Sequence, residues 1–294
     1  MSYRLSDVQA RISTVHQLES VVSAMRGIAA ARSREARSRL DGIRACAAMI
    51  GMAIGDALLL DERNVQPAPA DAGANTHVIV VLCAEQGFVG TFNEHVVEAA
   101  ARLQQTGATD YFVIGDRGLV VAAEHGLTAG WSAPMVAHAD EVGVLADRIT
   151  EALYERLESG LATRVTVLHA VPQLATAIEI VQQSLLPFDF TRFALPVRHL
   201  APLVTLPPHR LLARLAEEYV YTQLCEAIML SFAAENEARM RAMIAARTNV
   251  HDTLNRLIGD SRRLRQEEIT AEIVELASGS LTASGKRRQR RSPP

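Results

Sequence analysis

The chain of 294 residues is long enough for one large domain or two modest ones with a sizeable core. Its hydrophobic content of 49% and charged content of 21% are typical of a folded globular protein, and its net charge of −3 argues against a general nucleic-acid binder. Three widely separated cysteines form no CxxC pair, which argues against a disulfide framework or a zinc site. The opening MSYRLSDVQARI lacks the apolar core of a signal peptide, and no stretch approaches the ~20 apolar residues needed to span a bilayer.

Proline divides the chain into three parts. None precedes Pro67, and none lies between Pro208 and Pro293. Because proline breaks helices, both ends of the chain are open to long helices, whereas the middle is not. We therefore expect an N-terminal helix within 1–60, a central domain at 75–200 and a C-terminal helix at 209–283.

The first part carries a narrow apolar seam, with residues recurring at alternating spacings of three and four. Such a heptad pattern is typical of a coiled coil, because the apolar face of a helix in a globular core is wider. Glu19 is its one polar member. The seam comprises Leu5, Val8, Ile12, Val15, Glu19, Val22, Met25 and Ala29.

The last part repeats this pattern. Its seam comprises Met240, Met243, Arg247, Val250, Leu254, Leu257, Ser261 and Leu264. Two such helices at opposite ends of the chain predict an antiparallel coiled coil between them; the less favoured alternative is that each helix packs on a separate partner. Residues 284–294 carry five basic side chains, so we expect a disordered basic tail.

The middle alternates between strand-like and helix-like stretches. The apolar, β-branched run THVIVVLC at 76–83 predicts a strand buried on both faces, followed by a glycine loop and a helix over 94–107. This alternation predicts a small Rossmann-like α/β domain between the two long helices. The further expected elements are a strand at 110–115, a helix at 117–126, a helix at 139–160, a strand at 163–171 and an edge strand at 176–187.

The sequence shows no clear motif for a catalytic, nucleotide-binding or metal site. In the loop EQGFVG, Gly87 and Gly90 are three residues apart and match neither a dinucleotide-binding nor a P-loop pattern, so a tight turn is favoured over a nucleotide site. The histidines are scattered without metal-ligand spacing, and His169 is expected to be a core residue. We therefore expect no catalytic residue, no metal and no cofactor.

Arginines crowd one stretch of the first helix. A run of this kind fits a solvated helix face and a basic surface for an acidic partner about equally well, so the sequence leaves both interpretations open. The residues are Arg26, Arg32, Arg34, Arg37, Arg39 and Arg44.

Several of these segments resemble the γ subunit of F-type ATP synthases. AMRGIAAAR at 24–32 is similar to the family's AMxMVAAxK, and GFVGTFN at 87–93 resembles GLCGxFN. AAENEARMRAMIAARTN at 233–249 resembles ASExxARMxAMxxATxN, and RQEEITAEIVELASGS at 265–280 resembles RQxxITxELxEIVxGA. Departures such as Gly27 within the first helix indicate a divergent bacterial-type member, and one candidate is the alternative Na⁺-type enzyme.

The resemblance implies a non-catalytic central-stalk rotor that couples ion flow to ATP synthesis or hydrolysis. Its partners would be the α and β subunits of an α3β3 ring, the ε subunit and the c-ring, with no nucleic acid and no membrane insertion. The expected location is peripheral, on the cytoplasmic face of the bacterial plasma membrane. The implied rotor–stator contacts are Met25, Arg26, Arg239, Arg265, Gln266, Thr270 and Glu272.

Two functions from other classes remain as alternatives. The first is a nucleotide-binding α/β enzyme with helical arms, which would use the loop at Gly87–Gly90. The second is a static coiled-coil adaptor that binds one partner tightly without rotating. ATP binding by the purified chain separates the first alternative from the rotor, and the mode of partner binding separates the second.

Overall fold

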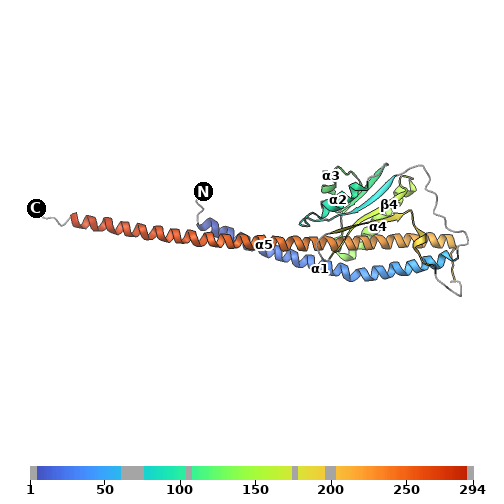
Figure 1. Cartoon of the computed structure of the whole chain (residues 1–294), viewed down its shortest axis with the longest axis horizontal. Coiled ribbons are helices and arrows are strands. Elements are labelled where there is room, and N and C mark those ends of the chain that lie inside the picture. The colour runs from blue at the N-terminus through green and yellow to red at the C-terminus, as the bar shows by residue number, and fades with distance from the viewer. Residues whose placement is uncertain (1–4, 61–75, 104–107, 174–177, 196–202, 290–294) are drawn as a thin grey trace. The chain divides into compact units, whose positions relative to one another are not determined.

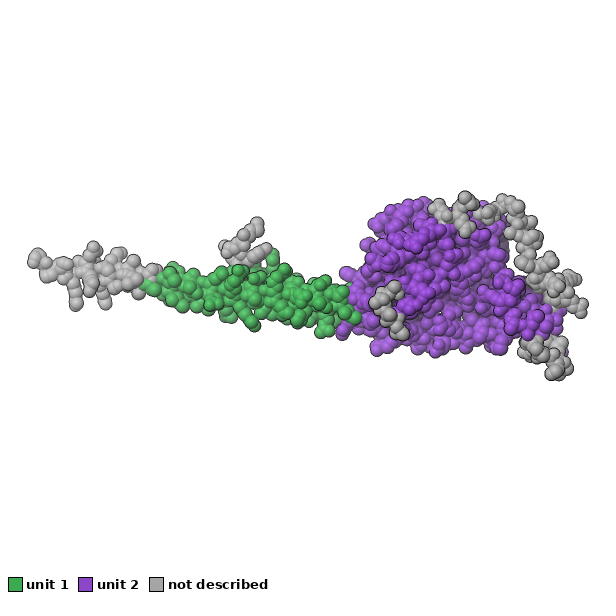
Figure 2. All heavy atoms as spheres, in the orientation of Figure 1, with its two compact units in different colours: residues 1–25, 243–294 green, residues 26–242 purple. Residues whose placement is uncertain are grey.

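The computed structural model describes residues 5–60, 76–103, 108–173, 178–195 and 203–289, with side chains up to Ala277. The chain divides into two compact units (Figure 2). Unit 1 consists of residues 1–25 and 243–294, and unit 2 of residues 26–242.

Two long helices account for the ends of the chain, as predicted. Helix α1 spans Leu5–Leu58, and helix α5 spans Pro208–Gln289 (Figure 1). Proline at the first position of α5 suits a helix start, because its missing N–H has no helical partner there. The helix includes residues 284–289, where we expected a tail, and the lysine, arginine and glutamine there favour helix. Residues 290–294 lie outside the described residues.

Within unit 2, α1 and α5 pack in antiparallel directions, which confirms the predicted pairing. Arg37 pairs with Glu237, and Arg44 Nε lies 2.8 Å from Glu226 Oε1. Farther along α1, Ile54 packs in one apolar cluster with Leu212. The contacted residue on α5 therefore moves back along the chain as α1 advances.

Within unit 1, the seam follows the predicted spacing with one correction. Val8 and Val22 of α1 are buried, as are Met243, Val250 and Leu254 of α5. Arg247, which we expected in this seam, is exposed, and Ala246 is partly buried instead. The spacing 243–246–250 keeps the heptad pattern, and a small apolar side chain fills the position without burying a charge.

The central domain of unit 2 contains a five-stranded sheet in the order β3-β2-β1-β4-β5. All neighbours are parallel except β4 and β5, which are antiparallel. Strand β3 was not predicted, because its sequence AGWSA lacks a β-branched run. The strands span His77–Leu82 (β1), Thr109–Ile114 (β2), Ala129–Ala133 (β3), Arg164–Val171 (β4) and Glu179–Leu186 (β5).

Helices cover both faces of this sheet, which explains why β1 is buried along its whole length. Ile79 and Val81 of β1 pack in the cluster with helices α2 and α3, whereas Val78 and Val80 pack in the cluster with α4, α5 and part of α1. Helix α2 spans Phe92–Arg102, α3 spans Asp116–Glu124 and α4 spans Val142–Glu158, with short 3-10 turns at Ala139–Glu141 and Phe190–Arg192. None of the described helices is long and apolar enough to cross a membrane.

The packing of α1 against α5 in unit 2 yields a stability prediction. Ile54 is fully buried, whereas Met52, two residues earlier on the same helix, is 65% exposed. Ile54→Ala is expected to lower the free energy of unfolding by about 2–5 kcal/mol, because it leaves a cavity between the helices. Met52→Ala, the matched control, should change it by no more than about 0.5 kcal/mol. Urea unfolding followed by circular dichroism measures both, and equal effects would contradict this packing.

Candidate functional site

Ligands of open α/β sheets bind outside the carboxyl ends of the strands, so the loop after β1 is a candidate ligand site. The polar groups of this loop are used inside the chain. Asn93 Oδ1 accepts a hydrogen bond from the amide of Ala84 at 2.8 Å. Glu85 Oε2 accepts from the amides of Met135 at 2.7 Å and Asp116 at 3.2 Å. These contacts hold the loop in place and leave the Glu85 carboxylate engaged with backbone amides.

Helix α5 fills the space beside the end of β1. Ser231 Oγ donates to the carbonyl of Leu82 at 3.1 Å, and Ala234 and Ala238 pack in the same cluster as Cys83. Small side chains on α5 let the helix lie close to the strand end. At this position beside the strand end, a nucleotide would have to displace the helix.

One side chain of α5 reaches the loop itself. Arg239 is only 5% exposed. Its Nη2 donates to Glu235 Oε1 at 2.5 Å and to the Gln86 carbonyl at 3.2 Å, and its Nε donates to the Gly87 carbonyl at 3.3 Å. Its Nη1 completes the set by donating to Asn236 Oδ1 at 3.2 Å. We call Arg239, Glu235 and these two carbonyls the Arg239 clamp.

The charges of this clamp are deeply buried. Burial raises the pKa of Glu235, and the nearby Arg239 guanidinium opposes that rise. Removing either partner would leave an unpaired charge in the interior, which is strongly destabilising. Burial likewise raises the pKa of the neighbouring Cys83 thiol, with smaller contributions from Glu235 and Glu94. Cys83 is therefore poorly suited to act as a nucleophile.

The clamp holds a strained turn. Phe88, the residue after Gly87, has a φ of 62°, an uncommon conformation for a residue with a side chain, and it is 67% exposed. Gly90 also has a φ of 62°, in line with the tight turn predicted there. The two carbonyls that precede Phe88 are the ones bound by Arg239, so the clamp stabilises this turn.

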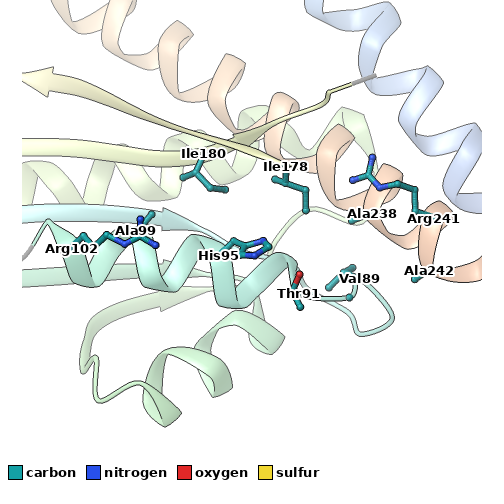
Figure 3. Close-up of a pocket in the computed structure, with 11 residues that line it drawn as sticks. Val89, Thr91, His95, Ala99, Arg102, Ile178, Ile180, Ala238, Arg241 and Ala242 are labelled. Carbon is teal, nitrogen blue, oxygen red and sulfur yellow. The ribbon is translucent and has the colours of Figure 1, made fainter. Parts of the chain in front are cut away.

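A groove of about 640 Å³ lies between α2, the start of β5 and α5 (Figure 3). Ile178 and Ile180 form its apolar wall, and His95, Arg102 and Arg241 supply polar and basic groups. The described residues that line it include no carboxylate. Among the described residues, no group of three or more histidine, cysteine or acidic side chains is placed to hold a metal ion.

The other predicted site residues lie on the long helices. Arg265, Gln266, Thr270 and Glu272 are all exposed on the unit 1 part of α5. Thr270 Oγ1 donates to the Gln266 carbonyl at 2.7 Å, and both residues line one shallow groove of the helix surface. At 100° per residue, Arg265 and Glu272 lie on the opposite side. The structure thus brings Gln266 and Thr270 together and separates them from Arg265 and Glu272.

The remaining two predicted residues are partly buried. Met25 ends the N-terminal part of unit 1, and Arg26 begins unit 2. Arg239 differs from all the others, because its guanidinium is committed inside the chain. Its partner Glu235 was not singled out from the sequence, although the spacing i, i+4 on a helix is a recognisable signal for an ion pair.

The arginine run of α1 is now partly explained. Arg37 pairs with Glu237, Arg39 with Glu35 and Arg44 with Glu226. Ser33 Oγ also donates to Glu237, at 3.3 Å. Half of the run therefore makes internal contacts, two of which tie α1 to α5.

Thiol reactivity gives a test of this burial pattern. Cys46 is exposed, whereas Cys83 is buried and the pKa of buried Cys225 rises to about 11, mainly through burial. In the folded chain at pH 8, only the Cys46 thiol should react rapidly with a disulfide reagent, because the attacking group is a thiolate that the reagent can reach. Cys46→Ser should remove this fast phase and leave two slow thiols. Rapid labelling of Cys83 in the folded chain would contradict the structure.

Comparison with known proteins agrees with this architecture. The chain matches the sequence model of the family described as ATP synthase over residues 4–282. An ATP synthase gamma chain of Hyphomonas neptunium is 29% identical, covering 94% of this chain and 98% of the relative, and one of Bdellovibrio bacteriovorus is 24% identical, covering 96% and 99%. Among solved structures, a chain of the Euglena gracilis mitochondrial ATP synthase, with a TM-score of 0.63 and 12% identity, covers 99% of this chain and 97% of its own length. The protein belongs to the ATP synthase gamma family.

Proposed function

We propose that this chain is the central-stalk rotor of an F-type ATP synthase, turning within a ring of three α and three β subunits. One observation carries the proposal. Every residue of α5 from 265 to 277 is exposed, including Ile269, Ile273 and Leu276. A helical stretch that packs against nothing is only marginally stable in water, so this one needs surrounding protein to cover it. An α3β3 ring would surround it in this way.

The chain itself is proposed to be non-catalytic, with ATP chemistry on the β subunits. The space beside the end of β1 is filled by α5, and its polar groups bind one another. The Cys83 thiol is buried with a raised pKa. These features supply neither a phosphate cradle nor an activated nucleophile.

The remaining partners are proposed to be the ε subunit and the c-ring, with the complex peripheral to the cytoplasmic face of a bacterial plasma membrane. The solved relatives support the c-ring as a partner, since they include a central stalk with a c-ring from the Tetrahymena thermophila mitochondrial ATP synthase and a rotor from that of Euglena gracilis. We propose no cofactor for this chain. Whether the coupled ion is H⁺ or Na⁺ is decided in the membrane sector.

The rotor–stator contacts are proposed to fall on Met25, Arg26 and the exposed set Arg265, Gln266, Thr270 and Glu272. Arg239 is left out, because its guanidinium is buried and bonded within the chain. Exposed side chains suit the task, since charged hydrogen bonds of about 1.5–3 kcal/mol can break and reform as the shaft turns. The two sides of the helix would then be engaged by different loops or at different angles.

These contacts give a first test in the assembled complex. Arg265→Ala combined with Gln266→Ala should lower ATP turnover by about tenfold or more, because it removes charge-assisted donors on two sides of the shaft. Assembly should remain intact, since both side chains are exposed. Arg214→Ala, an exposed arginine of the same helix within unit 2, is the control and should leave turnover unchanged. Wild-type turnover with full ion coupling in the double variant would refute the assignment.

A second test separates the rotor from the enzyme and adaptor alternatives. The purified chain should neither bind nor hydrolyse ATP, as isothermal titration and a phosphate-release assay would measure. Mixed with its cognate α and β subunits, it should restore rapid hydrolysis, and a probe on the chain should turn in one direction. ATP binding by the chain alone would favour the enzyme, and a tight one-to-one complex with a stationary probe would favour the adaptor.

A further inference from the structure

The Arg239 clamp joins two parts of unit 2 that a rotor must keep in register. One part is α5, which continues along the chain into unit 1, and the other is the α/β domain. The chain enters this domain after Leu58 and leaves it before Pro208, so its covalent links to the long helices are at those helix ends. Arg239 lies ~45 Å farther along α5 at 1.5 Å per residue. Among the described residues, it is the last of α5 with a hydrogen bond to the α/β domain.

Apolar packing holds α5 to the sheet, and hydrogen bonds add a directional restraint to this packing. Hydrophobic burial has no preferred direction, whereas a hydrogen bond weakens steeply as its angle falls. The clamp provides two such directional bonds, from one guanidinium to two successive carbonyls of the loop after β1. Glu235, one turn earlier on α5, holds the guanidinium in place at 2.5 Å. The clamp therefore opposes a twist of the loop relative to the helix.

We propose that the Arg239 clamp is a positioning element that transmits torque between the α/β domain and the shaft helix α5. The proposal rests on the proposed rotor function. It assigns Arg239 a role inside the rotor, distinct from the surface contacts with the ring. Other polar ties, such as that between Gln183 of β5 and Gln223 of α5, lie nearer the start of α5. The clamp holds the α/β domain at the far end of its contact with α5. If the domain pivoted about the start of α5, its displacement would be largest at that end.

The residue types fit this role. Arginine presents several donors in a rigid planar fork, so it can bond Glu235 and two carbonyls at once. Lysine at this position would keep the buried charge pair but would act as a single point charge. The charge-assisted bonds are strengthened by burial, since both side chains are no more than 5% exposed. An exposed pair of the same composition would be too weak to hold a domain.

The test uses the assembled complex with its ring immobilised. Cys46→Ser removes the exposed thiol, and Glu124→Cys on the exposed side of α3 attaches a probe to the α/β domain. Arg239→Met with Glu235→Gln removes the clamp without leaving a buried unpaired charge. Arg214→Met with Glu217→Gln removes an exposed ion pair of the same helix and is the matched control. Hydrogen exchange of the amides at 86–90 and the angular spread of the probe during pauses are the two readouts.

Loss of the clamp should speed amide exchange at 86–90 by about tenfold or more, because charged hydrogen bonds of this strength no longer close the loop. The angular spread of the probe should widen, and the control should change neither readout. Arg239→Lys should give an angular spread between those of the wild type and the double variant. If the double variant does not assemble, Arg239→Lys is tested with the same two readouts in its place.

Faster exchange with an unchanged angular spread would overturn the proposal, since the clamp would then only support the local fold. Unchanged exchange and spread would overturn it as well. A wild-type probe that does not turn at all would instead defeat the proposed rotor function, which keeps the two failures distinct.

Discussion

The structure depends on one helix, α5, which is buried on all sides along one stretch and exposed on all sides along another. From Ala227 to Arg239 every residue is buried, because the sheet and α1 surround this stretch within unit 2. From 265 to 277 every residue is exposed. A helix buried on all sides is usually apolar throughout, yet this one carries Glu235, Asn236, Glu237 and Arg239 in its buried stretch. Each of these four makes at least one hydrogen bond within the chain, which lowers the cost of burying polar groups.

This constraint explains what could be predicted from the sequence. The long helices and their seams follow from heptad spacing and from the absence of proline, which are local properties. Strand β1 was predicted because a continuous apolar run marks a strand that is covered on both faces. Strand β3 was missed, since its five residues gain their structure from pairing with β2. Arg247 was misplaced because spacing alone does not tell which of two adjacent residues turns inward.

The candidate site residues also show that local sequence does not reveal which side chains become buried. Arg239 and Arg265 are both arginines on one helix, and both match segments that resemble the same family. One is buried in a network of four hydrogen bonds, and the other is exposed. The difference lies in what surrounds them, because the loop after β1 meets α5 at Arg239. That contact joins residues 152 positions apart, and no local pattern records it.

The exposed part of α5 is also asymmetric, and asymmetry is what a rotor requires. Ile269, Ile273 and Leu276 recur at i, i+4 and i+7, so they form one apolar stripe. Gln266, Thr270 and Val274 line a groove on another side of the helix. A shaft with the same surface all round would offer each surrounding subunit an identical contact, so its angle could not make their sites differ. A static adaptor would need only one stripe, covered permanently by one partner. Distinct surfaces on different sides of one helix instead let orientation determine which subunit meets the apolar stripe and which meets the groove.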